Sequence, residues 1–145
     1  MTDSLTVLIF ETTAGDPSVE FLGDSGDIVY FISMAHSERY GADHPLAKAA
    51  SIIKRRLRVP MGPLLSFGDA AAENAVEEEL LGRLWQEAAG LAECARSVAA
   101  AIESDEELRE MTSALPELPE RLRELAAMAD WADEQGAKVR LTFVL

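Results

Sequence analysis

Both ends of this chain carry apolar runs that predict β-strands. Leu5–Phe10 is apolar and rich in β-branched side chains, which is typical of a strand covered on both faces. At the other end, apolar Val139, Leu141, Phe143 and Leu145 alternate with polar Lys138, Arg140 and Thr142. This alternation indicates a strand with one wetter face. Because neither strand can bury its apolar side chains alone, we expect the two to be paired or close neighbours in one sheet.

Two more strands are predicted near the N-terminus. Val19–Leu22 is a short, mostly apolar segment, and Ile28–Ile32 is apolar on both faces, as a central strand would be. The segment between them, Gly23–Asp27, has the glycine and aspartate content of a tight hairpin loop. The pattern therefore predicts three N-terminal strands, of which the last two form a hairpin.

The middle of the chain has the periodicity of helices. A first helix is predicted to begin at Asp43 or His44 as the N-cap, with Pro45 in the first helical position. The longest helix is predicted after Asp69. Its apolar stripe recurs at steps of 3, 1 and 3 through Leu81, Leu84, Trp85, Ala88, Leu91, Ala92, Ala95, Val98, Ala99 and Ile102. A stripe of this length predicts one unbroken helix of about seven turns.

Two further helices complete the predicted set. Ser104–Glu107 has the sequence of a capping box, which predicts that a new short helix starts there. Pro116 and Pro119 open a last helix, and Gly136 closes it. The pattern predicts a single α+β domain over residues 1–145. It has a small, mostly antiparallel sheet of three N-terminal strands plus the C-terminal strand, packed with three to four helices.

Charge is segregated along the chain. The 145 residues include 26 acidic and 13 basic side chains, a formal net charge of −13. Residues 61–136 hold 18 of the acids and 5 of the bases, whereas Pro45 and Pro60 enclose a cationic run without any acid. An acidic excess repels phosphate backbones, so we expect no nucleic-acid partner. The cationic run is expected either to pair with acidic helices of the same chain or to be solvated. It comprises Lys48, Lys54, Arg55, Arg56 and Arg58.

Other features of the sequence are typical of a soluble cytoplasmic protein. Cys94 is the only cysteine, so no internal disulfide can form. Residues 1–13 lack the basic start and the small-residue cleavage site of a signal peptide. Their apolar run is too short to span a bilayer. We therefore expect a cytoplasmic location and no membrane partner.

One short segment resembles the first sequence block of the GDSL-type esterases. The resemblance covers residues 19–25 and includes Gly23, Asp24 and Ser25. It implies a nucleophilic serine, which would need a downstream Asp-x-x-His motif to activate it. No histidine follows His44 in this sequence. We therefore interpret the segment as a hairpin loop and not as part of an esterase.

Titratable side chains cluster only in the segment 34–45. His36, Glu38, Asp43 and His44 offer nitrogen and oxygen atoms that could bind a divalent metal or take part in acid–base catalysis. Their spacing matches no standard metal site, and a solvated loop with Asp43 as a helix cap accounts for the same residues. We predict no metal and no cofactor, and we keep these four residues as the candidates for a catalytic site.

The last helix contains an aromatic residue that lies off its apolar stripe. Trp131 is about 140° from Leu118 on a helical wheel, and Met128 lies between the two. Glu120 and Glu124 belong to the same surface. An apolar anchor with an acidic rim is typical of a protein interface. The alternative is that Trp131 packs under a loop or against the adjoining strand.

These observations lead to two functional hypotheses. The first is a non-enzymatic interaction or regulatory protein whose acidic helical surface binds a basic protein partner, with a homodimer as a further form of assembly. It rests on the segregated charge and on the lack of a complete catalytic set. The second is a small enzyme or ligand-binding protein that uses the segment 34–45. A deep pocket beside His36 and His44 would favour the second hypothesis, and a flat acidic face would favour the first.

Overall fold

The computed structural model describes residues 7–18, 20–37 and 44–144. In chain order these residues form β1 (Val7–Thr12), α1 (Gly26–Ser37), α2 (Pro45–Ser51), the π-helix η3 (Ile52–Arg56), α3 (Gly62–Leu65), β2 (Phe67–Asp69), α4 (Ala75–Gly82), β3 (Gln86–Glu87), α5 (Ala88–Ser104), α6 (Glu106–Met111), α7 (Leu118–Glu134) and β4 (Lys138–Val144). The fold is α+β, but it has more helices than the three to four expected.

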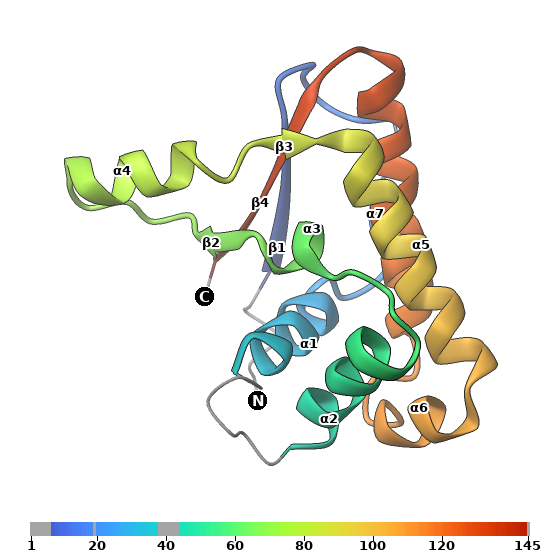
Figure 1. The fold of residues 1–145 in the computed structure, drawn as a ribbon. Helices are drawn as coiled ribbons and strands as arrows, with labels where there is room; N and C mark the ends of the chain where they lie inside the picture. The colour runs from blue at the N-terminus through green and yellow to red at the C-terminus, as the bar shows by residue number, and fades with distance from the viewer. Residues whose placement is uncertain (1–6, 19, 38–43, 145) are drawn as a thin grey trace.

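Strand β4 is the centre of a four-stranded sheet (Figure 1). β1 pairs with it in antiparallel direction along its whole length, from Val7 opposite Val144 to Thr12 opposite Val139. This pairing confirms the expectation that the two ends of the chain share a sheet. β2 pairs with β4 in parallel, and the short β3 pairs with it in antiparallel direction. The sheet is therefore mixed, and the expectation of a mostly antiparallel sheet with three N-terminal strands is wrong.

The segment expected to form a hairpin forms the start of helix α1 instead. Ile28–Ile32 is helical, and the backbone carbonyls of Asp24 and Ser25 accept hydrogen bonds from the first N–H groups of the helix. The side chains that α1 buries are Ile28, Val29, Phe31, Ile32 and Ala35. Most of them follow the spacing i, i+3, i+4, i+7 of a helix face, which in a run of five apolar residues cannot be distinguished from a buried strand.

The single long helix expected after Asp69 is divided into two. α4 ends at Gly82, the chain then extends through β3, and α5 begins at Ala88. Only α5 behaves as the apolar stripe predicts. Its buried residues are Ala88, Leu91, Ala92, Cys94, Ala95, Val98, Ala99, Ala101 and Ile102, whereas α4 buries none of its residues. A periodic stripe does not show where a helix is interrupted, and here the interruption follows a glycine, which is a poor residue for a helix interior.

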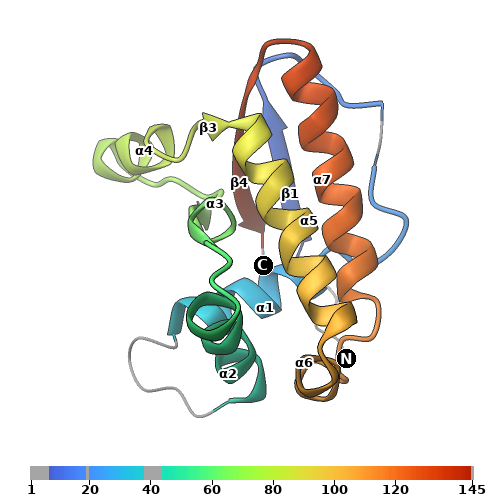
Figure 2. The ribbon, with the colours of Figure 1, turned by 45° about the vertical axis from the view of Figure 1, so that its right-hand side comes forward.

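Helices α5 and α7 lie side by side on one face of the sheet (Figures 1 and 2). Both bury several alanines, which allow helices to approach closely, and Val139 and Leu141 of β4 belong to the same buried cluster. The remaining helices α1, α2, α3 and α6 extend this core beyond the sheet, while α4 projects away from it (Figure 1). The fold thus has one thick helical layer on one face of the sheet.

Candidate functional site

His44 serves as a helix cap. It is the N-cap residue of α2, and its Nδ1 accepts a hydrogen bond from the N–H of Leu46 at 3.1 Å. Because Nδ1 accepts, the proton of the neutral ring lies on Nε2, which is 3.3 Å from the Tyr30 hydroxyl. The prediction that α2 begins with His44 as N-cap and Pro45 in its first helical position is confirmed.

His36 has different neighbours. It lies in the last turn of α1, and its ring meets the ring of Phe67 edge to face at a centroid distance of 6.3 Å. Glu38 and Asp43 lie outside the described residues. Within the described part of the chain, no group of three or more His, Cys, Asp or Glu side chains is arranged to hold a metal ion.

The residue resembling an esterase nucleophile is a structural contact. Ser25 is buried, and its Oγ accepts a hydrogen bond from the backbone N–H of Leu8 at 3.1 Å. The hydroxyl therefore joins the start of α1 to the outer edge of β1. This contact was not expected from the sequence, because Ser25 was assigned to a hairpin loop.

The apolar candidates on α7 are less exposed than expected. Met128 is 5% exposed and borders a hollow that is also lined by Leu8, Phe10 and Phe21. Trp131 is half-buried and packs against the hydrophobic core. The burial of Met128 leaves less apolar surface for a contact, and an interface through these two side chains stays a prediction.

The acidic candidates on α7 surround a buried arginine. Arg121 contacts Glu117, Glu120 and Glu124, and its side chain is 3% exposed. Glu124 also accepts a hydrogen bond from the backbone N–H of Leu22. Glu124 therefore holds the loop before α1 against α7, while Glu117 and Glu120 contact Arg121 within α7.

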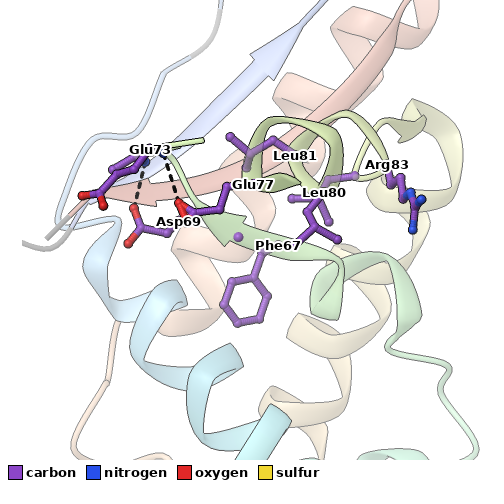
Figure 3. A pocket seen from close by; sticks show the side chains of 10 residues that line it. Phe67, Asp69, Glu73, Glu77, Leu80, Leu81 and Arg83 are labelled. Atoms are coloured by element: carbon purple, nitrogen blue, oxygen red, sulfur yellow. Dashed lines mark hydrogen bonds between the residues drawn. The ribbon is translucent and has the colours of Figure 1, made fainter. Parts of the chain in front are cut away.

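A further hollow lies under a segment that projects from the fold. Residues 70–85 run from the end of β2 through α4 to the start of β3 and project from the body of the fold (Figure 1). We call them the α4 arm. Between the arm and β2 is an open groove of about 680 Å³, which we call the α4 groove (Figure 3). It is lined by Phe67, Gly68, Asp69, Ala71, Glu73, Glu77, Leu80, Leu81, Arg83 and Leu84.

The α4 groove is apolar along its middle and charged at its ends. Leu80 and Leu81 lie over β2, with acidic side chains at one end and Arg83 at the other (Figure 3). Leu80 is 54% exposed, and Val76, one turn before it on α4, is 68% exposed. Residues 69–83 hold five acids and a single base. The groove therefore offers apolar contact area inside a negative surface.

Local hydrogen bonds fix the shape of the arm. Asn74 caps α4 by accepting a hydrogen bond from the N–H of Glu77, and Glu77 in turn accepts one from the N–H of Glu73. Asp69 accepts a hydrogen bond from the N–H of Ala71 at 2.9 Å. The hydrogen bond from Glu77 satisfies an amide that the start of a helix otherwise leaves without a partner, and the other two satisfy amides of the segment before α4.

The base of the arm is attached to the sheet by Arg140. Its guanidinium lies 4.5 Å from the ring centroid of Trp85 and donates hydrogen bonds to the carbonyl of Leu81 and the carboxylate of Glu11. The hydrogen bond from Arg140 lowers the pKa of Glu11, against the opposing effect of burial. A cation held over an aromatic ring and against a carboxylate keeps the arm in a defined position.

No sequence pattern predicts this groove. Val76 and Leu80 precede the apolar stripe used to predict the long helix, and the groove exists only because that helix is interrupted. The signals available were Gly82, inside the expected helix, and the acidic run Glu77–Glu79 beside the two apolar residues.

Comparisons with known proteins give no relative for this chain: no protein-family model, curated protein or solved structure matches it. Over the residues that the structure describes, no helix is both long and apolar enough to cross a membrane.

Proposed function

We propose that this protein binds a basic segment of a partner protein in the α4 groove. The observation that carries the proposal is the arm itself. α4 buries none of its residues, yet it presents Val76 and Leu80 beside an apolar groove. Apolar side chains rimmed by polar ones on an exposed surface are typical of interaction sites. Since Arg140 holds the arm in place, the surface is prepared before a partner arrives, which reduces the entropy lost on binding.

Charge selects the type of partner. The arm carries four acids and one base, Asp69 lies directly before it, and the whole chain has a net charge of −13. Two arms of identical copies would bring like charges together, which costs free energy at an interface and slows association. A basic partner would instead be attracted and would associate faster at low salt. A basic segment with apolar side chains therefore fits the groove better than a second copy does.

The test compares three forms of the protein as baits in the native host, with captured proteins identified by mass spectrometry. These are the wild type, Leu80→Gln in the groove and Leu22→Gln as the matched control. Leu22 is 85% exposed and belongs to the loop before α1. None of the three differs in net charge.

We expect a protein with a basic segment to be retained by the wild type and by Leu22→Gln, but not by Leu80→Gln, and to be released by moderate salt. With the purified partner, Glu78→Lys should weaken binding and reduce its dependence on salt, because Glu78 is an exposed acid of α4. An identical set of proteins on all three baits, or a partner without a basic segment, would contradict the proposal.

A further inference from the structure

We infer that the partner segment is an amphipathic α-helix that lies on the uncovered face of the sheet and inserts apolar side chains into the α4 groove. This inference rests on the proposed function and adds the conformation of the ligand and the full extent of its site.

The two faces of the sheet differ in how they are covered. Val139 and Leu141 of β4 are fully buried and belong to the core that includes α5 and α7. Side chains alternate along a strand, so the intervening residues of β4 point to the opposite side. That side, which we call the open face, carries Val7, Ile9 and Glu11 of β1 and their partners Val144, Thr142 and Arg140 of β4.

The arm lies on the open face. Gly68 is paired with Thr142, so a Cβ atom added at Gly68 would point to the open face. That Cβ would lie 3.0 Å from the side chain of Leu84 and 3.6 Å from that of Leu81, which places both leucines on this face. Trp85 also stacks on Arg140, which belongs to the same face. These residues of the arm lie over one end of the open face, where Thr142 is buried. At the other end of this face, the described residues include Val7, which is 45% exposed, and Val144, which is 42% exposed.

Exposed apolar side chains are concentrated on this side of the molecule. Among the described residues, the large apolar side chains classed as exposed are Val7, Leu22, Tyr30, Leu57, Val76, Leu80 and Val144. Four of these seven belong to the open face or to the arm. Single exposed apolar residues are common on any protein, but a concentration beside a groove marks a contact surface.

A helix suits this surface better than a strand does. β2, which borders the groove, has three residues and could offer an added strand only a few hydrogen bonds. A sheet face, in contrast, is commonly covered by a packed helix, and here α5 and α7 cover the other face in that way. A partner helix would therefore complete a second helical layer.

The dimensions and charge of the site define the helix. The six residues of β1 span about 20 Å at roughly 3.4 Å per residue, which a helix of about 14 residues matches at 1.5 Å per residue. Its apolar stripe would contact Val7 and Val144 on the sheet and Leu80 in the groove. Its outer positions would carry lysine or arginine, which the acids at the rim of the groove would attract.

The experiment uses two synthetic 15-residue peptides of identical leucine and lysine composition, each labelled with fluorescein. One places leucine at helical spacing, and the other alternates leucine and lysine as a strand would. Binding is measured by fluorescence anisotropy, and helix formation by circular dichroism. The protein is tested as wild type, Val144→Gln, Leu80→Gln and the control Leu22→Gln, with melting temperatures confirming that each folds. Val7→Gln replaces Val144→Gln if the latter melts at a lower temperature.

We expect the helical peptide to bind at least tenfold more tightly than the alternating one and to become helical on binding. Val144→Gln and Leu80→Gln should each weaken it about tenfold, since each removes one apolar contact, and Leu22→Gln should not. If only Leu80→Gln weakens binding, or if the alternating peptide binds as tightly, the inference is wrong while the proposed function stands. If neither variant weakens binding, both are wrong.

Discussion

Gly23 lies directly against the guanidinium group of Arg121. A Cβ atom at Gly23 would stand 1.5 Å from Nη1 and 2.7 Å from Cζ of that arginine. Arg121 cannot easily move away, because its guanidinium contacts the carboxylates of Glu117, Glu120 and Glu124. The Nε atom of Arg121 lies 2.7 Å from a carboxylate oxygen of Glu124, but this ion pair lacks the alignment of a hydrogen bond. The loop before α1 is therefore attached to α7 through a glycine that leaves room for the arginine.

We predict that Gly23→Ala destabilises the protein by about 1–3 kcal/mol, the usual cost of forcing extra atoms into a packed site. The matched control is Gly90→Ala, in helix α5, where an added Cβ meets nothing within 4 Å. The free energy of unfolding of this control should rise by up to about 1 kcal/mol, because alanine is a better helix former than glycine. Urea unfolding of both variants measures the two effects. Equal changes in the two variants would show that the contact with Arg121 does not constrain the loop.

The central position of β4 leads to a second prediction. β4 is paired with β1, β2 and β3, and its residues Val139 and Leu141 are fully buried. Deleting residues 138–145 removes the strand that holds the sheet together, so we expect the loss of cooperative thermal unfolding and of near-native far-UV circular dichroism. Val144→Gln, which keeps the pairing, should melt like the wild type. A truncated protein with an unchanged melting temperature would contradict the central role of β4.

The contact between Glu11 and Arg140 predicts a dependence of stability on pH. The hydrogen bond from Arg140 lowers the pKa of Glu11 in the folded protein, and a lowered pKa stabilises the fold only while the carboxylate is charged. Wild type should therefore exceed Glu11→Gln in free energy of unfolding at pH 7. The difference should shrink once the pH falls below about 4.3, the ordinary value for a glutamate, and vanish below the lowered pKa.

Urea unfolding of both proteins between pH 7 and pH 2 measures this difference. A gap that stays constant over the whole range would mean that the carboxylate of Glu11 contributes through packing and not through its charge. A useful companion is Arg140→Met, which should remove most of the pH dependence because the lowered pKa depends first on this arginine.

Burial of Cys94 predicts that its thiol reacts slowly with alkylating reagents. Its Sγ lies 3.3 Å from the carbonyl oxygen of Pro60, and burial raises its pKa to about 11. At pH 8 the thiolate fraction is then lower than that of an ordinary cysteine by roughly a hundredfold. Alkylation by iodoacetamide should be slower in the folded protein by at least that factor than in 8 M urea. Equal rates in the two states would show that the thiol is accessible.

The parts of the fold that the sequence predicted correctly depend on local signals. The cap at His44 and the following Pro45 are neighbours in the sequence, as are Gly136 and the end of α7, where the glycine adopts a positive φ of 70°. The paired chain ends follow from two apolar strands that both need a neighbour. Ile28–Ile32 could not be assigned in this way, because its burial on a helix face depends on distant residues that the local pattern does not contain.

The candidate site was missed for a related reason. The α4 groove combines residues from β2 and from both ends of the arm, and none of them belongs to a sequence motif. It requires the interruption of a helix at Gly82 and an anchor, Arg140, that lies far away in the sequence. The segregated charge is visible in the sequence. The sequence does not show which of the acidic residues lie beside exposed apolar side chains in the fold.

The last prediction concerns Trp131, for which the sequence left two interpretations open. Trp131 is half-buried and packs against the core, and neighbouring Met128 is almost fully buried. We therefore expect Trp131→Ala to cost about 1–3 kcal/mol in urea unfolding, less than the roughly 3–5 kcal/mol of a fully buried tryptophan. The control Val76→Ala, on the exposed side of the arm, should stay within about 0.5 kcal/mol. Sedimentation of both variants should match the wild type. If Trp131→Ala instead keeps the stability of the wild type and reduces its association, α7 and not the arm is the contact surface.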